Sequence, residues 1–416
     1  MNIKIKKRNL ESPQERKLVL LILILLLPHF EPGYFDAQVR LIDLIYNAGR
    51  VLSAVYIIYS AFLRKHKISK IMLLFFVFQG YYFVNTVMQN GFSKKILLNT
   101  VSMIIGCLII DTFSKQHIKQ LVHAMLIMFE LLIYLNFITV LAFPGGMYVT
   151  EWQTENWLLG FRNNFTTIFV PALCIAMIWR EITHRSLRTY IMIVICVATA
   201  ILGHSATCLA TIVLMVGIYF LCLYRIRIMT AMNVTIAYII SFFAVVVFRV
   251  VDYMAPILRR LGRSTTLTGR TYIWDRTINA IKNKPIFGYG MQSTEIRVAF
   301  VPEAHGATSA HNFILENLYL GGIIQLIIVV LFIGMIVYEL QKYKKEEVTH
   351  CLVLGMACTY VIFLVESGFS LSLFALLYLS YYAGRLCQVC RQGPSGYYCN
   401  NHRYKNKGKK EINSST

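Results

Sequence analysis

The chain has 416 residues, of which 57% are apolar and only 15% are charged, and its mean hydropathy is +0.58. Soluble proteins contain about 25% charged residues, so this composition excludes a soluble enzyme, a disordered regulator and a secreted disulfide scaffold. It predicts an all-α, polytopic integral membrane protein, because the apolar runs are continuous and do not alternate as in a membrane β-barrel. We attribute the net charge of +21 to basic loops on one side of a membrane, and expect no nucleic-acid partner.

Runs of about 20 apolar residues can cross the ~30 Å hydrocarbon core of a bilayer. The sequence predicts about twelve such transmembrane helices. The first run follows a basic segment, as in a signal peptide, but no small-residue cleavage site follows it, so we interpret it as a retained span. The predicted helices lie near residues 18–35, 41–63, 70–89, 95–113, 118–142, 164–179, 189–203, 206–224, 229–248, 312–338, 350–366 and 368–386.

In this arrangement, most basic residues of the short loops lie on the same side of the membrane as the N-terminus. By the positive-inside rule, both termini are therefore cytoplasmic. The chain then divides into nine transmembrane helices over 1–248, one large extracytoplasmic loop over 249–311, three helices over 312–386 and a cytoplasmic basic tail over 387–416.

The loop over 249–311 has nine basic and four acidic residues, and it contains a short predicted helix. Trp274, Ile278 and Ile281 have the i, i+4, i+7 spacing of one apolar helix face. Arg270 lies one turn before Trp274 and hence on the same side. This amphipathic pattern indicates a folded element within the loop.

The predicted helix ends before Pro285, as a helix before proline should. Gly288 and Gly290 then allow a tight turn. Arginines in an outer loop most often contact solvent or lipid headgroups, and three more precede the helix: Arg259, Arg260 and Arg263.

The chain re-enters the membrane near residue 312. Thr308 and Ser309 are candidate N-caps for this span, which would place His311 in its first turn. A helix N-terminus favours a bound phosphate and disfavours imidazolium, so His311 would stay neutral and able to accept a proton. A lone histidine here is usually only an interfacial polar residue. Beside a basic outer loop, it indicates an anionic, membrane-anchored substrate at the outer leaflet.

Several motifs occur here in a fixed order: Gly269-Arg270-x-x-x-Trp274, Pro285-Ile-Phe-Gly288-Tyr-Gly290, His311-Asn312-x-x-Leu315 and Gly321-Gly322-Ile-Ile. Their order and spacing resemble the signature of the O-antigen ligase and Wzy-type polysaccharide polymerase superfamily. The segment from Gly160 to Asn164 is also similar, with Arg162 followed by asparagine. The turn Ser205-Ala206-Thr207 resembles the Ser-Arg-Thr segment of these proteins but has alanine at its centre, so no role of that arginine is transferred.

The resemblance implies a GT-C-like membrane glycosyltransferase of the bacterial cytoplasmic membrane. Its donor would be an oligosaccharide on undecaprenyl pyrophosphate, transferred with inversion to an acceptor hydroxyl at the outer face without a metal ion or other cofactor. Arg270 and Arg162 would stabilise the leaving pyrophosphate, and His311 would take or orient the proton of the acceptor hydroxyl. The residues expected to bind the substrate are Asn312, Trp274, Arg259, Arg260, Arg263, Gly288 and Gly290.

The resemblance leaves the acceptor open. A polymerase extends a lipid-linked repeat unit, whereas an O-antigen ligase transfers glycan to lipopolysaccharide core. We favour the polymerase, with membrane lipids and a chain-length regulator as further partners. A transporter or flippase of lipid-linked sugars is the third hypothesis, and it would need ionisable residues inside its spans. The candidates are Asp43, Arg50, Glu130 and Glu366, of which Glu366 lies at the outer end of its span and would face the same cavity as His311.

The C-terminal segment contains Cys387, Cys390, Cys399 and His402. These side chains could hold a zinc ion tetrahedrally, but their spacing matches no zinc module known to us. We interpret the segment as a disordered basic tail near anionic lipid headgroups.

Overall fold

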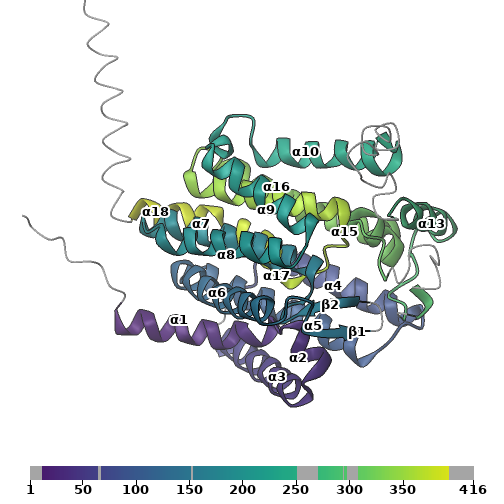
Figure 1. Ribbon diagram of the computed structural model, residues 1–416, viewed down its shortest axis with the longest axis horizontal. Helices are drawn as coiled ribbons and strands as arrows, with labels where there is room; N and C mark the ends of the chain where they lie inside the picture. The colour runs from purple at the N-terminus through teal and green to yellow at the C-terminus, as the bar shows by residue number, and fades with distance from the viewer. Residues whose placement is uncertain are drawn as a thin grey trace, which may run out of the picture.

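The computed structural model describes residues 12–63, 67–150, 153–250, 270–293, 295–297 and 308–392. Over these ranges the chain is mostly helical, and its helices form a bundle that lies nearly horizontally in Figure 1. The helices of the first half are α1 (Pro13–Leu26), α2 (Gly33–Gln38), α3 (Arg40–Leu63), α4 (Lys70–Met88), α5 (Lys94–Ser114), α6 (Ile118–Ala142), α7 (Phe165–Thr183) and α8 (Leu187–Leu202). Those of the second half are α9 (Ala206–Phe220), α10 (Ala231–Phe242), α13 (Arg270–Asn283), α15 (Phe313–Lys342), α16 (Glu347–Val365), α17 (Leu371–Ser380) and α18 (Ala383–Gln392).

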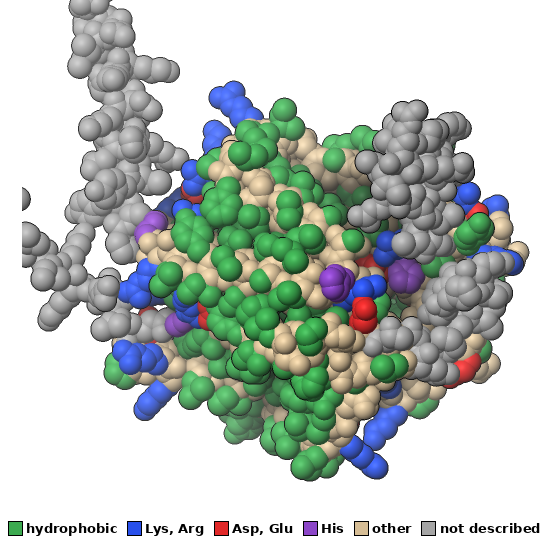
Figure 2. Space-filling model, viewed as in Figure 1, with side chains coloured by type: hydrophobic (Ala, Val, Ile, Leu, Met, Phe, Trp, Pro, Cys, Tyr) green, Lys and Arg blue, Asp and Glu red, His purple; other side chains and the backbone are tan. Residues whose placement is uncertain are grey.

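Seven helices within the described ranges are long and apolar enough to cross a membrane: α3, α4, α5, α6, α7, α15 and α16. Shorter apolar helices are α8, α9, α17 and α10 with its π-helical continuation η4 (Phe243–Val247). Figure 2 shows apolar side chains over the middle of one face and Lys and Arg near its margins. This architecture is consistent with the polytopic membrane protein that the composition predicts.

Helix α7 lies at the centre of the bundle. Its span is 78% buried, against 11% for the span of α3, and it packs against α6, α8, α9, α16 and α17. A helix that is apolar on all sides is suited to such a position. Gly355 of α16 permits a close approach, because a Cβ atom there would lie 2.6 Å from Cys174 Sγ.

The two ends of the bundle differ in structure (Figure 1). Helix α1 begins and α18 ends at one of them. At the other lie α13 and a small antiparallel sheet of order β1-β2-β3, formed by β1 (Tyr148–Thr150), β2 (Gln153–Trp157) and β3 (Gly160–Phe161). The chain enters α7 next to this sheet through the 3-10 turn η2 (Arg162–Asn164).

The structure corrects the prediction in three places. The sheet shows that the chain is not purely α-helical. The first span was expected at 18–35, but a capping box between Ser12 and Glu15 starts α1 earlier, and a 3-10 turn η1 (Leu27–His29) interrupts it at Pro28. The last span, expected at 368–386, is divided into α17 and α18.

Candidate functional site

Arg270 and His311, both predicted as catalytic residues, meet at the carboxylate of Glu366. Arg270 Nη2 donates to Glu366 Oε1 at 2.7 Å, and His311 Nδ1 lies 2.9 Å from Glu366 Oε2. The side chains of Arg270, His311 and Glu366 are 13%, 28% and 18% exposed. Because an ionised carboxylate only accepts hydrogen bonds, the contact assigns the proton of a neutral imidazole to Nδ1 and leaves Nε2 to accept a proton.

The charge of Glu366 is set by these two partners. Burial alone would raise the pKa of Glu366, but the hydrogen bond from His311 and the charge of Arg270 lower it below its ordinary value. Glu366 is therefore ionised at neutral pH. It can fix the ring orientation of His311 as the carboxylate of a catalytic triad does.

Trp274 fixes the helix on which Arg270 lies. Arg270 begins α13, and Trp274 follows one turn later on the predicted apolar face. The Trp274 ring is 1% exposed and packs with Phe242, Ala310 and Leu315. Trp274, which was also predicted to bind substrate, thus packs α13 against the start of α15.

Asn312, and not Thr308 or Ser309, is the N-cap of α15. Its Oδ1 accepts from Leu315 N at 3.0 Å, and its Nδ2 donates to Leu364 O at 3.2 Å. Both ends of this buried amide therefore bind the chain itself, and asparagine is among the most favourable N-caps. His311 lies just before the cap with φ of 45°, outside the first turn where it was expected.

Gly288 and Gly290 form a backbone junction with α15. Their φ values are 66° and 65°, and α15 is broken at Gly322, where φ is 63° and ψ is −159°. The carbonyl of Leu320 accepts from Gly290 N at 2.9 Å and from Asn85 Nδ2 at 2.8 Å. A broken helix in a membrane needs such replacement partners. Two of the sequence motifs thus bind each other, and the two glycines, which were also predicted to bind substrate, form part of this contact.

Arg162, the third residue predicted as catalytic, begins the 3-10 turn η2 at the entrance of α7. It forms an ion pair with Glu155 of β2. The adjacent Asn163 accepts a hydrogen bond from Ser205 Oγ at 3.4 Å, so the two further regions of resemblance are in contact. Three predicted substrate-binding residues lie outside the described part of the chain: Arg259, Arg260 and Arg263.

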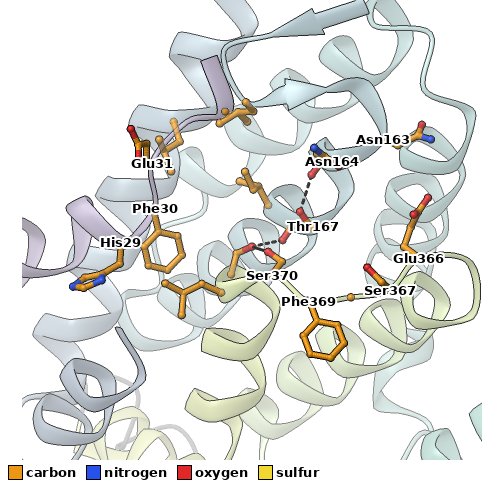
Figure 3. Close-up of a pocket in the computed structure, with 17 residues that line it drawn as sticks. His29, Phe30, Glu31, Asn163, Asn164, Thr167, Glu366, Ser367, Phe369 and Ser370 are labelled. Carbon is orange, nitrogen blue, oxygen red and sulfur yellow. Dashed lines mark hydrogen bonds between the residues drawn. The ribbon is translucent and has the colours of Figure 1, made fainter. Parts of the chain in front are cut away.

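A cavity of about 380 Å³ opens beside Glu366 (Figure 3). Asn163 and Asn164 line it from the entrance of α7, and Glu366 lines it from the loop between α16 and α17. Glu31, just before α2, also lines it and forms an ion pair with Arg50 at 2.7 Å. Glu31 was missed in the sequence, although an acidic residue beside Pro32 at the end of an apolar run is a visible signal.

The described ranges contain no candidate metal site. Within them, no group of three or more His, Cys, Asp or Glu could hold a metal ion. Cys387 and Cys390 lie on α18. Cys399 and His402, which the zinc hypothesis also requires, fall outside the described residues.

Residues 191–330 match the model of the family described as O-Antigen ligase. This part of the chain is a domain of the O-antigen ligase and Wzy-type superfamily. The superfamily domain runs from α8 into α15 and includes Arg270, Gly288 and His311, whereas Arg162 and Glu366 lie outside it. No curated protein matches the chain.

Proposed function

We propose that this superfamily member is a polysaccharide polymerase of the bacterial cytoplasmic membrane. It transfers glycan from an undecaprenyl-pyrophosphate donor to a hydroxyl of a second lipid-linked repeat unit at the outer face. The observation that carries the proposal is the convergence of Arg270 and His311 on Glu366 beside a cavity. A guanidinium and a proton acceptor held by one carboxylate suit a reaction in which a pyrophosphate leaves and a hydroxyl attacks.

Each group has a defined role in the proposed step. His311 Nε2 takes the proton of the acceptor hydroxyl, while Glu366 holds the Nδ1 proton and stabilises the imidazolium that forms. The acceptor oxygen bonds to the anomeric carbon as the bond from that carbon to the pyrophosphate oxygen breaks. The bonding electrons leave with the pyrophosphate, and Arg270 and Arg162 stabilise its charge. The proposed step inverts the anomeric configuration and needs no metal ion.

The O-antigen ligase is the second candidate, because the matching family model has that description. The two candidates share the proposed chemistry and differ only in the acceptor. The transporter hypothesis gains less support, because its candidate charges are engaged in contacts within the protein. Arg50 pairs with Glu31, and Arg188 pairs with Glu130.

The test uses purified protein in detergent and the lipid-linked repeat unit of the source organism as the sole substrate. A ladder of lengthening glycans, lost in His311→Ala, supports the polymerase. An unchanged substrate band contradicts it. Lipopolysaccharide core added to the same reaction then tests the ligase, which predicts one new product on the core.

A further inference from the structure

The cavity beside Glu366 is lined by two distinct walls. The first wall is formed by Asn163, Asn164 and Thr167 at the entrance of α7. The second wall, which faces the first, is formed by Phe30 and Glu31 ahead of α2 (Figure 3). The loop after α16 closes the remaining side. A volume of about 380 Å³ lies within the usual range of small-molecule pockets, ~300–1,000 Å³.

The chemistry of the lining suits a neutral, hydroxyl-rich ligand. Hydroxyl and carboxamide side chains line the cavity together with the rings of Phe30 and Phe369 and with aliphatic side chains. No lysine or arginine is among the described residues that line the cavity, and both ring nitrogens of His29 bond to serine hydroxyls. With Glu31 and Glu366 in its wall, the cavity is unfavourable for a phosphate or pyrophosphate.

Glu31 has a carboxylate oxygen that accepts no hydrogen bond from the described residues. Its Oε2 accepts from Arg50 Nη2 at 2.7 Å, and the side chain is only 3% exposed. Its Oε1 is buried and has no hydrogen-bond partner among the described residues. A buried carboxylate oxygen without a donor is unfavourable, and a ligand hydroxyl in the cavity would satisfy it.

Glu366 connects the cavity to the proposed chemistry, because it lines the cavity and binds both Arg270 and His311. We propose that the cavity is the subsite for a neutral sugar residue of the acceptor, and that Glu31 accepts a hydrogen bond from one of its hydroxyl groups. The assignment of this sugar to the acceptor rests on the proposed function, whereas saccharide binding can be measured without turnover. The subsite places the acceptor sugar beside Glu366, which binds the proposed proton acceptor His311.

The experiment measures binding of the lipid-free repeat-unit oligosaccharide, released from the lipid-linked intermediates of the source strain. Saturation-transfer NMR titrations give its Kd with wild-type full-length protein in detergent. Asn164→Trp fills the cavity from an exposed position and should raise the Kd more than about tenfold. The titrations are run at about pH 8.5, above the pKa of about 7 to which burial raises Glu31, so that Glu31→Gln replaces a charged acceptor with a neutral one. This change should raise the Kd about fivefold.

Two control variants test whether a change in Kd comes from the cavity or from adding a Trp side chain or removing a glutamate charge elsewhere in the protein. Val149→Trp adds the same side chain at an exposed position of β1 that does not line the cavity. Glu347→Gln removes the charge of a glutamate paired with Arg225 at the opposite end of α16. Both controls should keep the wild-type Kd, and melting temperatures report whether each variant is folded.

The outcomes distinguish the two proposals. No saturable binding to wild-type protein, or an unchanged Kd in both Asn164→Trp and Glu31→Gln, overturns the subsite even if the lipid-linked substrate is polymerised. Binding that these variants weaken, in a protein that polymerises nothing, supports a saccharide site and contradicts the transferase. Where Asn164→Trp does not fold, the Glu31→Gln titration decides alone.

Discussion

Glu366 accepts hydrogen bonds from an arginine and a histidine that are 96 and 55 residues distant in the chain. One carboxylate therefore orients both the proposed proton acceptor and the proposed anion-stabilising group. Its own role is to position His311 and Arg270, because in the proposed step it touches neither the breaking nor the forming bond. The charge on Glu366 depends on the same partners, so the three residues act as one unit.

Arg270 should not tolerate a conservative replacement. In Arg270→Lys, a single ammonium cannot bind Glu366 and a pyrophosphate oxygen through the separate nitrogens of a guanidinium fork. We expect the rate of glycan transfer to fall about 10²-fold. Initial rates with the lipid-linked substrate test this, with Arg276→Lys at an exposed position of the same helix as the control. A rate in Arg270→Lys equal to that of wild type would remove the argument for the fork.

Glu31 should make stability depend on pH. Burial raises the pKa of Glu31 to about 7, against the opposing charge of Arg50 and with Asp43 and Asp36 adding to the rise. A raised carboxyl pKa favours the protonated form in the folded protein, so the stabilisation is full below the ordinary pKa of 4.5 and is lost as pH rises to about 7. The melting temperature of wild type should therefore fall relative to that of Glu31→Gln between these values. Parallel curves would contradict this account.

At the scale of elements, the break in α15 depends on the glycine at position 322. A Cβ atom at Gly322 would lie 2.1 Å from Ile286 O, and the residue has a positive φ. We expect Gly322→Ala to destabilise the protein by about 3 kcal/mol or more. Thermal unfolding in detergent measures this.

Gly334, on the same helix, is the matched control. A Cβ atom there meets nothing within 4 Å, so Gly334→Ala should be neutral or stabilising by about 0.5–1 kcal/mol. Equal melting temperatures for the Gly322→Ala and Gly334→Ala variants would show that the junction with Gly288 is not a structural constraint.

Helix positions were predictable from the sequence, because the thickness of the bilayer sets the length of an apolar run that crosses it. The predicted spans at 70–89 and 118–142 match α4 and α6 closely. The errors occur where local hydrogen bonds decide the boundary. The capping box of Ser12 extended α1, and Asn312 competed successfully with Ser309 as the cap of α15.

The site was only partly predictable, for a related reason. Arg270 and His311 fall in recognisable motifs, and Glu366 could be placed at the outer end of its span. The carboxylate of Glu366 binds both Arg270 and His311 only because of the way α13, α15 and α16 pack together. A local sequence pattern does not predict this packing. Glu31 is visible in the sequence as an acid at the end of an apolar run, but this position does not indicate which residues will surround it.

At the scale of the whole molecule, the sheet-bearing end should face outward, and the end where α1 begins and α18 ends should face the cytoplasm. Val149 on β1 and Ile228 before α10 are 64% and 73% exposed and lie near opposite ends. In spheroplasts of a Cys222→Ser strain, a membrane-impermeant maleimide should label Val149→Cys and leave Ile228→Cys unlabelled. The reverse pattern would invert the topology and place the Glu366 cluster in the cytoplasm.

The most direct test compares the two glutamates at the ends of α16. Wild type, Glu366→Gln and Glu347→Gln are each incubated with the lipid-linked repeat unit, and initial rates of polymer formation are measured. We predict that Glu347→Gln polymerises at the wild-type rate and that Glu366→Gln is slower by about 10²-fold or more, through a fall in kcat. Polymer formation by Glu366→Gln at the wild-type rate would contradict the role assigned to the Arg270–Glu366–His311 cluster.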